Sequence, residues 1–167
     1  MSMNEMTSLE MLDLDLDQIE DSPQFLRDLP AGIYQCDMYT TLGENETKDP
    51  TTKEKNGIMD TKLTTTFIIT EVLDVTPDPK VEEGMDCVPK AGDMFQMNYF
   101  YARGVQDYVT DYRAVITNTG ITKPLQFIEQ NGKDSPVTVA IHTTRKWGTY
   151  DGEPSADLGV KTCEPVD

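Results

Sequence analysis

The segment with the clearest chemical potential spans residues 93–103 and reads DMFQMNYFYAR. At the spacing of a β-strand, its alternate aromatic and methionine side chains share one face, and a cation closes the run. Flat rings can stack on nucleic-acid bases, and a cation can contact phosphate. The pattern therefore predicts a platform for single-stranded nucleic acid, with the contact residues Phe95, Tyr99, Tyr101 and Arg103.

The same alternation is also typical of a strand that packs in a hydrophobic core, because strands favour aromatic residues for packing. Met94 and Phe100 lie on the face opposite Tyr99, so both faces of this strand are apolar. One face must pack in the interior, and the other meets a helix, a ligand or a subunit. The sequence leaves open which face does which.

A second cluster joins cations and large aromatics in the sequence RKWGTY. Here Arg145 and Lys146 could contact phosphate while Trp147 and Tyr150 stack on bases. The alternative is a hairpin whose tryptophan covers the end of a barrel. Lys62, at the start of another expected strand, completes the candidate nucleic-acid contacts.

The charge of the chain argues against a polyanionic ligand, since the formal net charge is -16. Such a field repels nucleic acid unless the contact surface is locally neutral or basic. The excess is uneven, because residues 1–30 hold eight acidic residues and a single base, Arg27. Nearly half of the net charge therefore lies in a short terminal segment.

Residues 1–29 are expected to form a flexible acidic arm, and residues 30–167 a single domain that opens at the turn sequence PAG. In the arm, Leu12, Leu14 and Leu16 alternate with aspartates. Leucine mixed with acid suits a segment that folds on a protein partner, although an unstructured terminus would have a similar composition.

Several classes of protein find no support in the sequence. No nucleophile, phosphate-binding or zinc-protease motif occurs, so we expect no enzymatic activity and no cofactor. His142 is the sole histidine, and the DLDLD run lacks the glycine and glutamate of a calcium loop, so we expect no metal site. Neither a signal peptide nor an apolar span of membrane length is present, and three scattered cysteines suit reduced thiols in a cytoplasm.

Turn residues and periodicity divide the domain into five strands with helices between the third and the fourth. The expected strands span 33–42, 62–76, 93–103, 137–141 and 157–163. A helical stripe follows Gly104 and ends at Gly120, and Thr122 is expected to cap a second short helix. A long polar loop is expected at 43–61, and a turn at 147–152. This order predicts a mainly β, OB-fold-like Greek-key barrel with a ligand face on strands 2 and 3, although a β-sandwich or another α+β meander could share it.

Four short motifs support that interpretation: LPAGIY at 29–34, GDMF at 92–95, LQFIE at 125–129 and VTVAI at 137–141. In this order, after an acidic lead-in, they resemble the OB-fold single-stranded-DNA-binding proteins of tailed bacteriophages. The resemblance implies a role in DNA replication or recombination, in the cytoplasm of an infected bacterium. That family often recruits partners through an acidic C-terminal tail. This chain ends in KTCEPVD, with two acids, so its acidic segment is the N-terminal arm instead.

Three functions therefore compete. The first is a non-catalytic protein that binds single-stranded DNA by stacking and local basic contacts. The second is an acidic interaction protein that mimics DNA or inhibits a host nucleic-acid enzyme, with a replication or host protein bound by the arm. The third is a structural component of a phage virion, where an oligomer would be expected.

Overall fold

The computed structural model describes residues 7–18, 26, 29–76, 88–150 and 152–166, and for residues 147–150 and 153–156 it describes the backbone alone. The helices are α1 (Ser8–Leu12), a 3-10 turn (Leu16–Gln18), α2 (Tyr101–Asn118) and α3 (Pro124–Gln130). The strands are β1 (Gly32–Lys48), β2 (Lys55–Val75), β3 (Met94–Phe100), β4 (Val137–Tyr150) and β5 (Glu153–Pro165).

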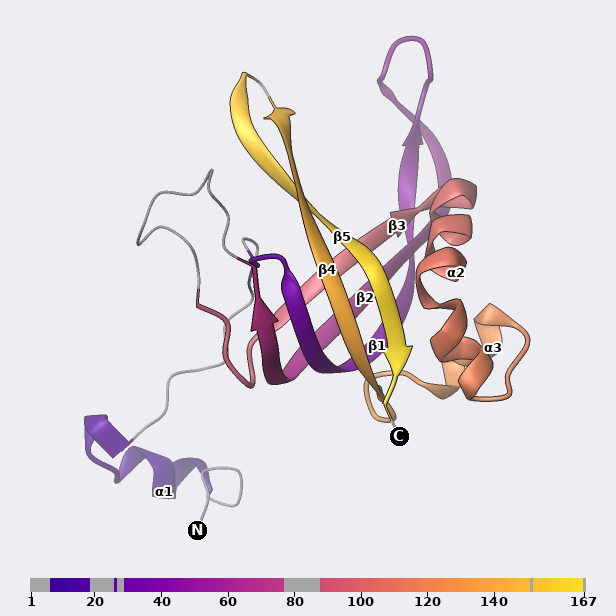
Figure 1. Cartoon of the computed structure of the whole chain (residues 1–167). Coiled ribbons are helices and arrows are strands. Elements are labelled where there is room, and N and C mark those ends of the chain that lie inside the picture. The colour runs from indigo at the N-terminus through magenta and orange to yellow at the C-terminus, as the bar shows by residue number, and fades with distance from the viewer. Residues whose placement is uncertain (1–6, 19–25, 27–28, 77–87, 151, 167) are drawn as a thin grey trace.

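The five strands form one antiparallel sheet in the order β3-β2-β1-β4-β5 (Figure 1). The prediction of a mainly β chain with five strands and helices after the third is thus confirmed. The predicted closure into a barrel is wrong, because no pairing joins β3 to β5 in the described part of the chain. Helix α2 packs against both of these strands and against β2, so it covers the open side of the sheet where a barrel would close.

The expected loop at 43–61 is instead a two-stranded ribbon. Pairing of β1 with β2 continues from Gly43 opposite Lys62 to Lys48 opposite Lys55, and only residues 49–54 form the turn. The carboxylate of Asp49 organises this turn by accepting the backbone N–H groups of Thr51 and Thr52 at 2.8 and 3.0 Å. Both faces of the ribbon are largely exposed, so its strands lack the apolar alternation on which strand prediction depends.

The β4–β5 hairpin is also longer than predicted. The backbone of residues 147–150 continues β4, and Tyr150 pairs with Glu153 across a turn in which Gly152 has φ +80°. A glycine tolerates that left-handed conformation without steric cost, which lets two residues reverse the chain. In Figure 1 this hairpin and the β1–β2 ribbon both project beyond the core of the sheet.

The hydrophobic core lies between the sheet and α2. Inward residues of β1 alternate with half-buried ones, so Tyr34, Cys36 and Met38 are fully buried. Phe67 of β2 stacks on Phe95 of β3, with ring centroids 4.8 Å apart and an interplanar angle of 12°. Offset aromatic stacking of this kind adds to the stabilisation that burial provides.

Helix α2 confirms the predicted helical stripe and begins earlier than expected, at the last residues of the aromatic segment. Its buried side chains are Tyr108, Tyr112, Val115 and Ile116, as the spacing predicted. The second helix, α3, starts at Pro124 after Lys123, whose side chain makes no capping hydrogen bond. The prediction that Thr122 caps this helix is therefore wrong.

Part of the acidic segment belongs to the folded core. Leu26 and Leu29 are buried, and the backbone N–H of Leu26 donates to the Met94 carbonyl at 2.7 Å. Helix α1 buries no residue, and its Leu9 and Leu12 are each 79% exposed. Packing therefore reaches back to residue 26, four residues before the predicted start of the domain.

Candidate nucleic-acid interface

The aromatic strand β3 turns its rings inward. Phe95 is fully buried against Phe67, and Tyr99 is 8% exposed beneath α2, where its hydroxyl donates to Asp111 at 2.7 Å. This corrects the placement of Phe95 and Tyr99 on a ligand face. The cause is the phase of the strand, since the side chains that alternate with Gln96 and Asn98 face α2.

Tyr101 is not a strand residue but the first residue of α2. Its backbone has φ +62°, which redirects the chain from strand to helix without an intervening loop. The half-buried side chain accepts a hydrogen bond from the Asn45 amide at 3.1 Å and donates one to the Glu46 carbonyl at 2.9 Å. Its ring centroid lies 5.9 Å from that of Phe100.

The opposite side of β1, β2 and β3 forms what we call the outer face. Cross-strand partners share a face of a sheet, so the register assigns residues to this side in rows. Phe100 lies opposite Lys62, Asn98 opposite Thr64, and Gln96 opposite Thr66. The outer face comprises Tyr39, Thr41, Lys62, Thr64, Thr66, Gln96, Asn98 and Phe100.

Side chains on the outer face are held by contacts within it. Thr64 donates to Asn98 at 3.0 Å, and Gln96 donates to Thr66 at 3.1 Å. The ammonium of Lys62 lies 5.5 Å from the centre of the Phe100 ring, within the range of a cation–π contact. Phe100 is 40% exposed, so its ring remains open to solvent beside this cation.

The outer face is almost free of acidic residues. Lys62 is the one charged member of the set, and Asp37, half-buried opposite Ile68, is the next charge along β1 on the same side. The acids of the chain therefore concentrate elsewhere, and the local charge here is close to neutral despite the net charge of -16.

The structure joins some of the predicted contact residues and separates others. Lys62, Phe100 and Tyr101 lie together, although Phe100 was expected on the non-ligand face. Arg103 is on α2, where it pairs with Asp107 at 3.2 Å with its side chain 84% exposed. Arg145, half-buried, and Lys146, exposed, lie on β4 beyond its pairing with β1. The side chains of Trp147 and Tyr150 lie outside the described part of the chain.

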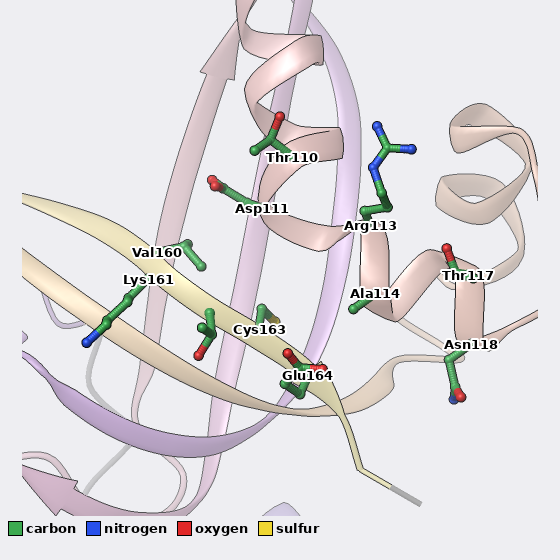
Figure 2. A pocket seen from close by; sticks show the side chains of 11 residues that line it. Thr110, Asp111, Arg113, Ala114, Thr117, Asn118, Val160, Lys161, Cys163 and Glu164 are labelled. Atoms are coloured by element: carbon green, nitrogen blue, oxygen red, sulfur yellow. The ribbon is translucent and has the colours of Figure 1, made fainter.

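A groove of about 720 Å³ separates α2 from β5 (Figure 2). Asp111 and Arg113 line it from α2, and Lys161 and Glu164 line it from β5. Charges of both signs balance here, so the groove offers a polyanion no advantage over the outer face. The sequence analysis missed it because its two walls are far apart in sequence.

The floor of this groove contains a short polar network. The hydroxyls of Tyr99 and Tyr112 lie 2.7 Å apart, and since Tyr99 donates its proton to Asp111, Tyr112 donates to Tyr99. Burial raises the pKa of Asp111, and the hydrogen bond from Tyr99 lowers that pKa in part. Burial also raises the pKa of the Cys163 thiol, to about 12, so this cysteine is not a nucleophile at neutral pH.

Metal and membrane sites receive no support from the residues that the structure describes. Among them, no three histidine, cysteine or acidic side chains gather as a metal site would require. No helix within the described ranges is long and apolar enough to span a membrane. Comparison of the chain with protein-family models, curated proteins and solved structures gives no match.

Proposed function

We propose that this chain is a non-catalytic protein that binds single-stranded DNA, in phage DNA replication or recombination, through an OB-like sheet. The strand order β3-β2-β1-β4-β5 supports this, because it is the order of an OB barrel opened between strands 3 and 5. OB-folds bind oligonucleotides on strands 2 and 3, flanked by the loops between strands 1 and 2 and between strands 4 and 5. Both of those connections are projecting hairpins in this chain.

The observation that carries the proposal is the Lys62–Phe100 pair on the outer face. An exposed ring beside an ammonium group offers stacking to a base and a charge to the adjoining phosphate. The surrounding threonine, asparagine and glutamine side chains add hydrogen-bonding groups without adding negative charge. A near-neutral face on so acidic a chain is the arrangement that a nucleic-acid ligand requires.

This site predicts modest affinity with little sequence preference. Base–aromatic stacking contributes on the order of 1–3 kcal/mol per base, and Phe100 supplies one well-exposed ring on the outer face. One cation on this face predicts a shallow dependence of affinity on salt, because each phosphate contact adds roughly 0.7 to the slope for single strands.

Fluorescence anisotropy with labelled oligo-dT, at low and at moderate salt, tests the proposal. We expect the Phe100→Ala variant to weaken binding by roughly tenfold, since about 1.4 kcal/mol of stacking corresponds to that factor. The Lys62→Ala variant should weaken binding less and flatten the salt dependence. Absence of binding by the unmodified protein at low salt would refute the proposal.

Matched controls come from α3 and the residue before it, where Leu125 is 52% exposed and Lys123 is exposed. The Leu125→Ala and Lys123→Ala variants remove an equally accessible apolar group and an equally accessible cation away from β2 and β3. We expect both to bind oligo-dT as the unmodified protein does. A loss of binding as large as that of Phe100→Ala would mean that the outer face is not the contact surface.

A second candidate function has its own observation. Leu9, Leu12 and Leu16 are highly exposed on a segment that also carries Glu10, Asp13, Asp15 and Asp17. Such a segment suits a protein partner that offers an apolar groove with basic margins. An acidic interaction protein of this kind would not bind oligo-dT, and it would lose its partner on deletion of residues 1–18.

A further inference from the structure

Tyr101 occupies a backbone conformation that a tyrosine rarely adopts. Its φ of +62° is left-handed, where a Cβ approaches the following carbonyl and glycine or asparagine is the usual choice. The position requires this conformation because β3 ends at Phe100 and α2 begins at Tyr101, with no residue between them. Strained residues persist where the surrounding structure fixes them, and they concentrate at functional positions.

A glycine at position 101 would make the same turn without strain, so the side chain of Tyr101 must supply something that glycine lacks. That side chain reaches the β1–β2 ribbon, which we define as residues 44–48 and 55–61. Its hydroxyl donates to the Glu46 carbonyl at 2.9 Å and accepts from the Asn45 amide at 3.1 Å. Tyr101 therefore joins the start of α2 to the ribbon.

The contact falls where the ribbon is least secured by its own ladder. The pairing of β1 with β2 shifts register between Glu46 and Lys48, so the ladder is irregular at the carbonyl that Tyr101 binds. The ribbon also extends past the last β2–β3 pair, Lys62 with Phe100, and has no neighbouring strand in the described structure. A two-stranded ribbon is marginally stable without such support.

The same residue adjoins the proposed contact surface. The Tyr101 and Phe100 rings are 5.9 Å apart, and Phe100 contacts Lys62. Asn45 belongs to the row that follows Gly43 and Lys62 on the outer face, so the hydroxyl of Tyr101 lies at the border between that face and the ribbon. A shift of the ribbon would alter the border against which a bound strand lies.

We propose that Tyr101 is a positioning residue that locks the β1–β2 ribbon to α2 and thereby holds the ribbon and Phe100 in one arrangement for single-stranded DNA. The lock itself follows from the contacts of Tyr101, whereas its consequence for the ligand rests on the proposed function. The ribbon then forms the upper border of the nucleic-acid surface, and its position depends on one hydroxyl group.

The test uses the full chain and its Tyr101→Phe variant, which keeps the ring and removes the hydroxyl. Hydrogen–deuterium exchange of the ribbon amides and anisotropy with labelled oligo-dT are measured on both proteins. We expect roughly tenfold faster exchange in the ribbon, in line with the loss of one hydrogen bond, and oligo-dT binding weakened severalfold. The Tyr34→Phe variant is the control, because it loses a hydroxyl that donates to the Pro30 carbonyl at 2.6 Å, far from the ribbon.

The outcomes separate the lock from the proposed function. Unchanged ribbon exchange in Tyr101→Phe, or equal acceleration in Tyr34→Phe, overturns the lock whatever happens to DNA binding. Faster ribbon exchange with unchanged oligo-dT affinity overturns the positioning role. Faster ribbon exchange in a protein that never binds oligo-dT supports the lock and refutes the proposed function.

Discussion

Asp111 shows how one side chain makes the stability of this fold depend on pH. The carboxylate is partly buried in the groove between α2 and β5, accepts the Tyr99 hydroxyl, and forms no ion pair with a described cation. Burial without a countercharge disfavours the ionised form, so the pKa of Asp111 is raised in the folded state. The folded protein therefore holds a proton on Asp111 to a higher pH than the unfolded chain does.

The Asp111→Asn variant tests the sign of this effect. As pH falls from 7 through the raised pKa, the folded state takes up the proton before the unfolded state, and unfolding becomes less favourable. We expect the wild type to gain stability over Asp111→Asn as pH falls, and the gain to be complete below the unfolded pKa of about 3.9. Urea denaturation of both proteins at several pH values between about 4 and 7 measures the difference.

Asp49 supplies a control of opposite sign. Backbone hydrogen bonds from Thr52 and Thr51 hold the pKa of this exposed carboxylate below its usual value. Its contribution is present above the unfolded pKa and is lost as pH falls through the folded pKa. The Asp49→Asn comparison should therefore show the wild type losing its advantage in acid. Parallel trends for the two variants would contradict both assignments.

At the scale of elements, the close approach of α2 to β3 depends on a residue without a side chain. A Cβ at Gly104 would lie 2.6 Å from the backbone carbon of Tyr99, which is closer than packing allows. The helix can therefore lie on the end of β3 only with glycine at this position. Through this contact α2 covers the open side of the sheet, so the packing of the whole core depends on it.

The Gly104→Ala variant should be destabilised by about 1–3 kcal/mol, the usual cost of overpacking, despite the better helix propensity of alanine. Chemical denaturation monitored by circular dichroism gives the free energy of unfolding. Gly43→Ala is the matched control, since its nearest atom lies 3.8 Å from the added Cβ. An alanine at 104 that stabilises the protein would show that α2 and β3 are not in this close contact.

Elements with one buried face could be predicted from the sequence, and elements without one could not. The stripe from Tyr108 to Ile116 defined α2, and the alternation around Tyr34 defined β1, because each buries one side. The ribbon residues 44–48 and 55–61 are largely exposed on both sides, so no apolar period marked them as strands.

The candidate site was half predictable for a related reason. Lys62 and Tyr101 were recognised by residue type, but alternation within β3 cannot say which of two apolar faces is inside. Phe95 and Tyr99 were placed on the ligand face, whereas the structure buries them and leaves Phe100 accessible. The deciding contacts are the ring of Phe67 and the helix residue Asp111, which the sequence of β3 does not contain. The groove between α2 and β5 was missed because it needs tertiary structure as well.

At the scale of the whole molecule, like charges are spread over the surface with few compensating contacts. The net charge is -16, and in the described part of the chain the ion pair is Arg103–Asp107, which is exposed. Exposed pairs contribute about 0–1 kcal/mol, so this contact offsets little of the repulsion. Compaction brings the carboxylates closer together, and the folded state carries more of this repulsion than the unfolded chain does.

Added salt should therefore stabilise the fold while it weakens DNA binding. Screening shortens the range of repulsion from about 30 Å at 0.01 M to about 8 Å at 0.15 M ionic strength, so the melting temperature should rise by a few degrees over this range and then level off. Over the same range, affinity for oligo-dT should fall, because fewer counterions are released on binding. Differential scanning fluorimetry and anisotropy on the same samples measure both quantities.

The levelling separates screening from other effects of salt, since exclusion of salt from the protein surface would stabilise the fold in proportion to concentration. A melting temperature that falls or stays constant between 0.01 and 0.15 M, values chosen for their roughly fourfold difference in screening length, would show that carboxylate repulsion does not limit stability. Opposite responses of stability and binding are the specific expectation for an acidic fold with one near-neutral face. A DNA mimic would show the rise in melting temperature without any oligo-dT binding to lose.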